Sequence, residues 1–155
     1  MRRKRLYKRD HKSDARYDNI ALNRFINCLM RGGKKSVAER VVYRALDIVQ
    51  RETKAEPISV FEKAVENASP WVEVSSKRVG GASYQIPREV RPERKFMLAS
   101  RWIIAASRGK KGKGMSEKLA EELMAAYKNE GSAIKKKQDI HRMAEANRAF
   151  AHFAR

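Results

Sequence analysis

The sequence predicts a mainly α-helical fold, with about six helices forming one bundle-like domain from which a two-stranded β-hairpin protrudes. Apolar residues recur at spacings of three and four along most of the chain, which is the helical period, and glycine or proline stands at several of the breaks. One stretch, residues 71–87, is instead rich in β-branched residues around a Gly-Gly pair. With 155 residues, 42% of them hydrophobic, the chain is long enough to bury one core.

The first helix is predicted from Asn19 onward, and Gly32-Gly33 ends it. Cys28 lies on its apolar side and is expected to be a core thiol. The residues at helical spacing that form this side are Leu22, Phe25, Ile26, Leu29 and Met30.

Two further helices are predicted before the hairpin. Ser36 and Glu39 have the spacing of a capping box at the start of the second helix, which continues through Val49. Pro57 suits the first turn of the third helix, because proline has no N–H to leave unsatisfied there, and Pro70 ends this helix.

The hairpin is predicted with strands at residues 71–79 and 82–86, joined by a turn at Gly80-Gly81. Pro87 is expected to end the second strand. Because a two-stranded ribbon is only marginally stable alone, we expect its base to lean on the helices and its tip to project. Trp71 is expected to belong to the core.

Three helices are predicted after the hairpin. The fourth helix is expected to direct five side chains toward the core: Phe96, Ala99, Trp102, Ile103 and Ala106. A glycine- and lysine-rich loop, residues 108–114, separates it from a fifth helix that Ser116 opens and Gly131 ends. The sixth begins after Ser132 and places on one face Ile140, Met143, Ala144 and Phe150.

Most of the excess positive charge lies in two segments. The formal net charge is +18. Residues 1–16 hold eight basic and two acidic side chains, residues 74–116 hold eleven and two, and the remaining residues hold 17 and 14. Such a concentration is typical of a protein that binds a polyanion. We therefore divide the chain into a basic N-terminal arm, residues 1–17, expected to be extended or disordered, and one helical domain, residues 18–155, with the hairpin at about 71–87.

The fourth helix carries the strongest indication of phosphate contact. At 100° per residue, four arginines fall within roughly a 100° arc opposite the apolar face: Arg91, Arg94, Arg101 and Arg108. No acidic residue occurs between Glu93 and Glu117. Arginine can hold two phosphate oxygens at once, and Lys110, Lys111 and Lys113 follow in the adjoining loop.

Three other basic segments fit either a nucleic-acid contact or a solvated surface. They are the link at Lys34-Lys35, the run Lys135 to Lys137 near a helix start, and the hairpin tip. The tip carries Lys77, Arg78 and Tyr84, and a ribbon with cations and an aromatic ring can enter a groove or lie across a single strand.

Patterns typical of enzymes and metal centres are missing from the sequence. His11, His141 and His152 lack metal-ligand spacing, and no motif for a nucleophile, a P-loop or a dinucleotide occurs. We therefore expect no catalysis, no cofactor, no metal and no small-molecule substrate. No run approaches the ~20 apolar residues of a membrane span. Lone Cys28 fits a reducing cytosol, so we expect a cytoplasmic protein without a membrane partner.

Four stretches of the sequence match a known family in order and spacing. They are Phe25-Ile26 with Gly33-Lys34-Lys35 and Val41-Val42, Phe61 to Asn67, Val79 to Pro87, and Arg142 to His152. In these stretches, within residues 18–153, the chain resembles small-subunit ribosomal protein S-seven of the bacterial and chloroplast type.

The resemblance implies a structural protein that binds the 3′ major domain of the small-subunit ribosomal RNA (rRNA) and organises assembly of the subunit head. It also implies a hairpin near exit-site transfer RNA (tRNA) and messenger RNA (mRNA), contacts with neighbouring head and platform proteins, and a cytoplasmic or chloroplast ribosome as location. Two alternatives stay open: an architectural DNA binder, although Gly80-Gly81 offers no apolar wedge to kink a duplex, and a regulator that binds mRNA.

The resemblance and the charge pattern together define the candidate residues. Those expected to bind rRNA are Lys8, Arg9, Lys34, Lys35, Lys77, Arg78, Arg91, Arg94, Arg101, Arg108, Lys110, Lys111, Lys113, Met115, Lys136 and Arg142. Those expected near tRNA and mRNA are Lys77, Arg78, Gly80, Gly81 and Tyr84. Met115 enters through the resemblance alone.

Overall fold

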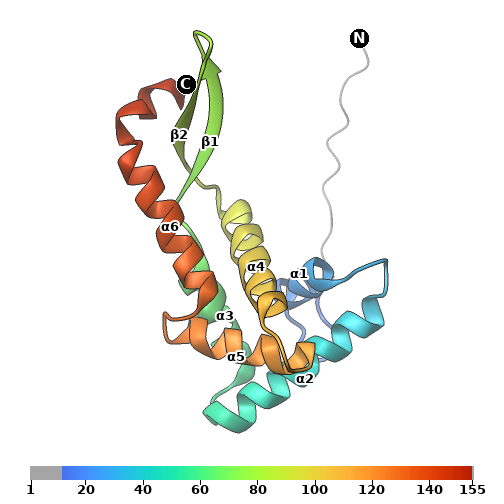
Figure 1. Cartoon of the computed structure of the whole chain (residues 1–155). Coiled ribbons are helices and arrows are strands. Elements are labelled where there is room, and N and C mark those ends of the chain that lie inside the picture. The colour runs from blue at the N-terminus through green and yellow to red at the C-terminus, as the bar shows by residue number, and fades with distance from the viewer. Residues whose placement is uncertain (1–11, 155) are drawn as a thin grey trace, which may run out of the picture.

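The computed structural model describes residues 12–154 and confirms a mainly α-helical fold with a protruding antiparallel hairpin (Figure 1). In chain order the elements are α1 (Ile20–Leu29), α2 (Lys35–Thr53), α3 (Pro57–Ala68), β1 (Val72–Val79), β2 (Ala82–Glu89), α4 (Pro92–Gly109), α5 (Met115–Tyr127), α6 (Ser132–Ala146) and the 3₁₀ helix η1 (Arg148–Ala154). The hairpin and the C-terminal end of α6 extend together away from the other helices.

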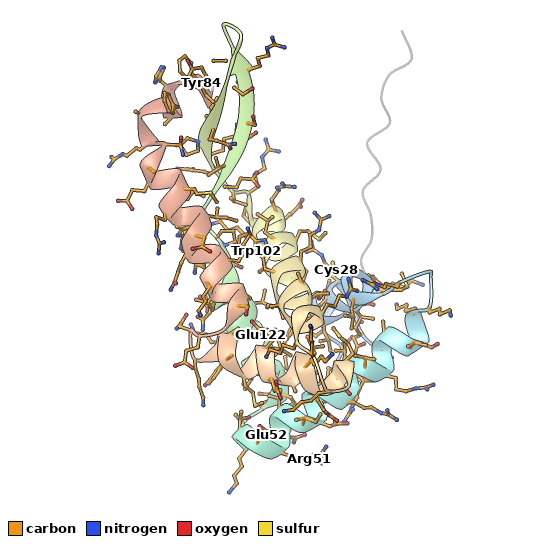
Figure 2. The ribbon with its side chains drawn as sticks, in the orientation of Figure 1. Cys28, Arg51, Glu52, Tyr84, Trp102 and Glu122 are labelled. Carbon is orange, nitrogen blue, oxygen red and sulfur yellow. The ribbon has the colours of Figure 1, made fainter. Side chains whose placement is uncertain are left out.

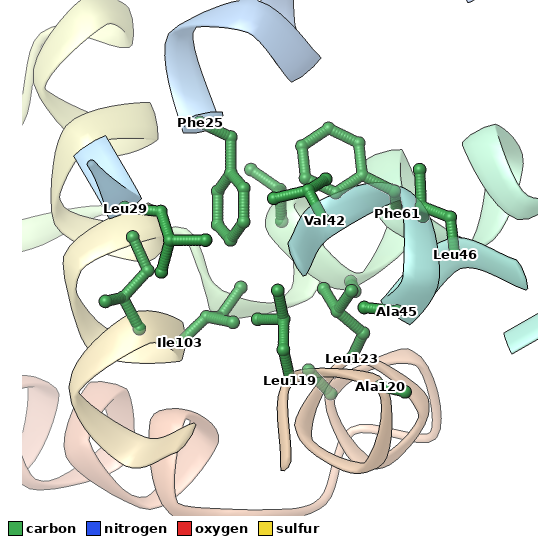
Figure 3. Close-up of a cluster of buried hydrophobic side chains, with 14 of the residues drawn as sticks. Phe25, Leu29, Val42, Ala45, Leu46, Phe61, Ile103, Leu119, Ala120 and Leu123 are labelled. Atoms are coloured by element: carbon green, nitrogen blue, oxygen red, sulfur yellow. The ribbon is translucent and has the colours of Figure 1, made fainter. Parts of the chain in front are cut away.

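The hydrophobic core lies where α5 packs against α2, α3 and α4, with α1 closing one side. Phe25 of α1 meets Phe61 of α3 edge-on, with ring centroids 5.3 Å apart, and both rings are buried. Val42 and Leu123 fill the space between these rings and α5 (Figure 3). Each fully buried side chain of this kind contributes about 1.5–3 kcal/mol, so the core holds five helices in one arrangement.

The start of α2 differs from the prediction. Asn19 caps α1 through a bond from the Leu22 N–H to its Oδ1, but no side chain caps α2. A tight turn, in which the Lys35 N–H donates to the Gly33 carbonyl, leads directly into a helix that begins at Lys35. Ser36 is thus already inside the first turn, and the predicted capping box is wrong.

The hairpin turn at Gly80-Gly81 is confirmed, and both glycines have positive φ (57° and 92°), as such a turn requires. The second strand, however, continues through Pro87 to Glu89, which the prediction missed. Pro87 lies opposite Val74, and counted from the turn this is a pair without mutual hydrogen bonds. The missing N–H of Pro87 therefore faces an unpaired edge, where proline is tolerated.

The C-terminal residues brace the hairpin. The sixth helix was expected to carry Phe150, but α6 ends at Ala146 and Phe150 lies in η1. There its ring contacts Tyr84 of β2 at a centroid distance of 5.0 Å, and the Lys77 Nζ donates to the Phe153 carbonyl oxygen at 2.9 Å. The hairpin therefore packs against η1 along β2 and not only at its base (Figures 1 and 2).

Trp71 was expected in the core, and this is wrong: its side chain is 69% exposed. The backbone explains this position, because the Trp71 carbonyl accepts the Val90 N–H at 3.0 Å, which closes the base of the hairpin and leaves the ring outside. The Lys95 ammonium lies 3.8 Å from the ring centroid. Trp102, in contrast, is partly buried against the core as expected.

His141 of α6 ties the hairpin base to the helices. The Trp71 N–H donates to its Nε2 at 3.2 Å, which requires a neutral ring. Burial, followed by the Lys137 charge, lowers the pKa of His141. The folded protein therefore binds this proton less well than the unfolded chain, and the contribution to stability is complete above the ordinary value of about 6.5.

We expect the free energy of unfolding to fall as the pH drops below about 6.5 toward the lower folded-state pKa of His141. Urea titrations between about pH 5.5 and pH 7.5 measure this. His141→Gln, whose amide oxygen can still accept the Trp71 N–H, should flatten the profile over that interval. An unchanged profile in the variant would show that His141 does not carry the pH dependence.

The inner end of the arm, residues 12–17, contacts α2. Asp14 is buried and accepts the backbone N–H groups of Arg16 and Tyr17 and, at 2.7 Å, the Tyr43 hydroxyl. Burial and the Asp14 carboxylate raise the pKa of Tyr43 to about 12. Arg16 pairs with Asp47 at 2.8 Å, so α2 anchors this segment. Lys8 and Arg9 lie outside the described residues.

Candidate nucleic-acid interface

Three arginines from two helices converge on one side of the molecule. Arg24 of α1 and Arg94 and Arg101 of α4 line a shallow concavity of about 270 Å³, together with Met97. The Arg24 guanidinium lies 4.7 Å from the centroid of Phe96, an aromatic contact that bridges the two helices. Sequence reasoning missed Arg24, because a single arginine outside the apolar stripe of α1 gives no indication of which helix will pack beside it.

Arg94 also serves the hairpin. Its Nε lies 3.0 Å and 3.3 Å from the two carboxylate oxygens of Glu73 in β1. No acidic residue follows Arg94 on α4, and the fold supplies one from the hairpin. The Arg94 side chain is still 56% exposed, so it can contact a phosphate while it joins the hairpin base to α4.

Residues that are distant in sequence meet at a second concavity, of about 350 Å³. Lys34 of the link, Arg108 of α4 and Met115 of α5 all line it, and Arg31 adds a cation that the sequence reasoning missed. The Arg108 guanidinium donates to the Leu29 carbonyl at the end of α1, and burial lowers the pKa of Arg108. The concavity therefore combines an apolar wall with a cationic rim, which suits a nucleotide.

The glycine- and lysine-rich loop is held by acidic residues of α5. The Lys110 Nζ lies 3.1 Å from Glu122 and 3.6 Å from Glu121, and Lys113 also pairs with Glu121. The hydrogen bond from Lys113 lowers the pKa of Glu121 and raises the pKa of Lys113. Half of the loop's charge is thus compensated within the protein, whereas Lys111 is exposed.

Glu122 is the most deeply buried charged side chain described, at 1% exposure (labelled in Figure 2). One carboxylate oxygen accepts the Ala133 N–H at the start of α6, and the other faces Lys110. Gly131, with φ 93°, packs so closely that an added Cβ would lie 2.9 Å from this carboxylate. Glu122 therefore joins the loop to the junction of α5 and α6, a role that its sequence position does not reveal.

The remaining candidates occupy other parts of the surface. Lys136 lines a groove of about 500 Å³ between α4, α6 and the hairpin, which Arg94 and Trp102 also line. Lys137 points inward, where it donates to the Asn67 carbonyl at 2.6 Å and burial lowers its pKa. Arg91 precedes α4 as its N-cap residue, so the helical arginine stripe begins at Arg94.

Many of the candidates are exposed, and some also contact other side chains. Lys35 faces Glu39 at 3.8 Å, and Tyr84 packs against η1. The exposed candidates in the link, the hairpin, α4 and α6 are Lys34, Lys35, Lys77, Arg78, Gly80, Gly81, Arg94, Arg101, Arg108, Lys136 and Arg142.

No helix within residues 12–154 is long and apolar enough to span a bilayer. Over the same range, no three histidine, cysteine or acidic side chains are grouped to hold a metal ion. The described surface offers instead cationic concavities with apolar walls on a helical body. This combination defines a nucleic-acid-binding protein.

Comparison with known proteins narrows this class. The model of the ribosomal protein S7p/S5e family matches residues 1–148. The small ribosomal subunit protein uS7 of Thermotoga maritima is 54% identical over 153 residues, 99% of each chain. The protein of the same name in Chelativorans sp. is 53% identical over 98% of this chain and 97% of its own length. The one in Chloroflexus aggregans is 54% identical over 92% of this chain and 90% of its own length.

The chain therefore belongs to the ribosomal protein S7p/S5e family, which confirms the resemblance found in the sequence. Proteins of this family are structural components of the small ribosomal subunit and not enzymes. RNA binding and a role in translation follow from that membership.

Proposed function

We propose that the chain binds the 3′ major domain of the small-subunit rRNA through the concave face of α1, the α1–α2 link and α4, and that it thereby organises the subunit head. The observation that carries the proposal is that Arg24, Arg101, Lys34 and Arg108, from three separate segments, line two concavities that both lie between α1 or its link and α4. Concave cationic surfaces favour a folded RNA junction, whose phosphates approach from several directions.

Binding works by replacing counterions on the RNA with fixed cations. The guanidinium groups of the arginines on α4 hold phosphates in place. The apolar wall that includes Val37 and Met115 can pack against an unstacked base. Lys110 and Lys113 are paired with α5 carboxylates, so an RNA phosphate must compete with Glu121 for them. The loop therefore contributes less affinity per charge than the exposed Arg101.

The same proposal places the hairpin near exit-site tRNA and mRNA, and other parts of the surface against neighbouring head and platform proteins. Two contacts support a hairpin of fixed direction: the Arg94–Glu73 pair at its base and the Tyr84–Phe150 contact on β2. A braced ribbon can present Arg78 and the exposed turn glycines to RNA without an ordering cost on binding.

A salt-dependent titration of the full chain against an rRNA fragment of the 3′ major domain tests the proposal. With on the order of 8–12 phosphates neutralised, log affinity should fall with log salt concentration at a slope of about 0.7 to 0.9 per phosphate. Duplex DNA and tRNA should fail to displace the fragment. Equal affinity for all three polyanions would contradict specific recognition of this RNA.

A further inference from the structure

The glycine- and lysine-rich loop between α4 and α5 is not held in place by packing of its glycines. An added Cβ at Gly109 or Gly112 would meet no atom within 4 Å, so both positions face open space. Gly112 also has a positive φ of 84°, a conformation that most other residues avoid. Glycine loses more conformational freedom on folding than any other residue, so a loop of this composition needs an anchor to keep one shape.

The anchor is a buried ion pair. The Lys110 Nζ lies 3.1 Å from a carboxylate oxygen of Glu122, whose side chain is 1% exposed. Glu122 is fixed in turn, because its other oxygen accepts the Ala133 N–H at 3.0 Å. Glu121 also faces Lys110, at 3.6 Å, but it is 37% exposed and shared with Lys113. Solvent screens the pair with Glu121 more strongly, so Glu122 contributes most to holding Lys110.

The loop joins two helices that line one concavity. Arg108 at the end of α4 and Met115 at the start of α5 line the concavity of about 350 Å³, together with Lys34 of the link. We call it the Met115 concavity. Lys111 lies in the loop between these two helices and is exposed. The shape of the loop therefore decides where the Lys111 ammonium stands relative to the cationic rim of the Met115 concavity.

We propose that Glu122 is a positioning residue for RNA binding. Through Lys110 it holds the loop in one shape, in which Lys111 and the loop backbone can meet a phosphate beside the Met115 concavity. A loop that is ordered in advance loses little conformational entropy when RNA binds, and the affinity rises accordingly. The inference rests on the proposed function, which assigns RNA to this concavity, and goes further by giving a buried carboxylate a role in binding a polyanion.

The variant Glu122→Gln separates the charge of this side chain from its hydrogen bond, because the amide oxygen can still accept the Ala133 N–H. Removal of a negative charge should by itself tighten binding to a polyanion. Positioning predicts the opposite sign, with binding to the 3′ major domain fragment weakened about fivefold. The matched control is Glu121→Gln, which removes the same charge beside the same lysine and should bind equally or more tightly.

Binding by Glu122→Gln that is as tight as that of the unaltered chain, or tighter, would overturn the inference. Equal weakening by Glu121→Gln would also overturn it, because the exposed carboxylate would then serve the loop as well as the buried one. The unaltered chain reports on the proposed function by itself. If it binds the fragment specifically and Glu122→Gln binds as well, the inference fails and the proposed function stands.

Backbone ¹⁵N relaxation of the free protein tests the loop without RNA. Order parameters for the amides of residues 109–114 should be about 0.85 in the unaltered chain and in Glu121→Gln, as in rigid backbone, and should fall below about 0.6 in Glu122→Gln. Values below about 0.6 in the unaltered chain would overturn the inference, even if Glu122→Gln failed to fold. Helix amides that keep their values in Glu122→Gln would confine the change to the loop and support the inference.

Discussion

The double variant Arg24→Gln with Arg101→Gln should bind the 3′ major domain fragment about 10- to 100-fold more weakly than the unaltered chain. Charge-assisted hydrogen bonds are worth roughly 1.5–3 kcal/mol each when formed, and part of that is recovered by water when they are lost. The two guanidinium groups line one concavity between α1 and α4, so both would leave the same part of the interface. The salt slope should fall by about 1 for each arginine.

A matched variant removes two positive charges elsewhere. Arg51 and Lys54 lie at the end of α2, outside the two concavities that Arg24, Arg101, Lys34 and Arg108 line, and Figure 2 shows Arg51 at the far end of the body from the hairpin. Arg51→Gln with Lys54→Gln should lower affinity only through net charge, by about threefold or less at physiological salt, where exposed charges beyond ~8 Å are screened. Equal losses in the two double variants would remove the α1–α4 concavity from the interface.

Replacing Glu122 by alanine should lower the free energy of unfolding by about 2–4 kcal/mol. The change leaves the buried Ala133 N–H without its acceptor, and an unsatisfied buried donor costs about 1–3 kcal/mol. Lys110 loses its nearest carboxylate as well, and the removed side chain leaves a cavity beside Gly131. Urea unfolding followed by circular dichroism measures the effect.

Glu121→Ala is the control for this measurement, because it removes the neighbouring carboxylate, which also pairs with Lys110 but is partly exposed. Exposed ion pairs contribute about 0–1 kcal/mol, so this variant should remain close to the unaltered chain. It should also free Lys113 from its ion pair with Glu121, so the affinity for RNA should equal that of the unaltered chain or be slightly higher. If Glu121→Ala destabilised the fold as much as Glu122→Ala, the buried hydrogen bond would not be the cause.

The helices could be predicted because their causes are local. Apolar residues at helical spacing define one face of each helix, and Gly32-Gly33, Pro57 and Pro70 act on the backbone within a residue or two of where they stand. One error arose where a capping pattern competed with the turn before it. Ser36 and Glu39 satisfy a capping pattern, but the turn ahead of them starts α2 at Lys35, before the cap could act.

The candidate site could be predicted in its cations but not in their partners. Charge density along the chain identifies Arg101 and the loop lysines, since density is a property of the sequence alone. Whether each cation is available depends on carboxylates that packing brings near it, as Glu73 comes to Arg94 and Glu121 to Lys113. Such pairs join residues of different elements, so the spacing of residues along the chain does not predict them.

The sequence by itself thus determined a helical protein that binds a polyanion, with a hairpin and a basic central segment, because period, turn residues and charge are local quantities. Only the tertiary structure decided that Arg24 joins the arginines of α4, that Glu122 is buried, and that Trp71 faces outward. The physical reason is the same in all three cases: burial and partnership depend on which helix faces pack together, and that is settled by the whole core at once.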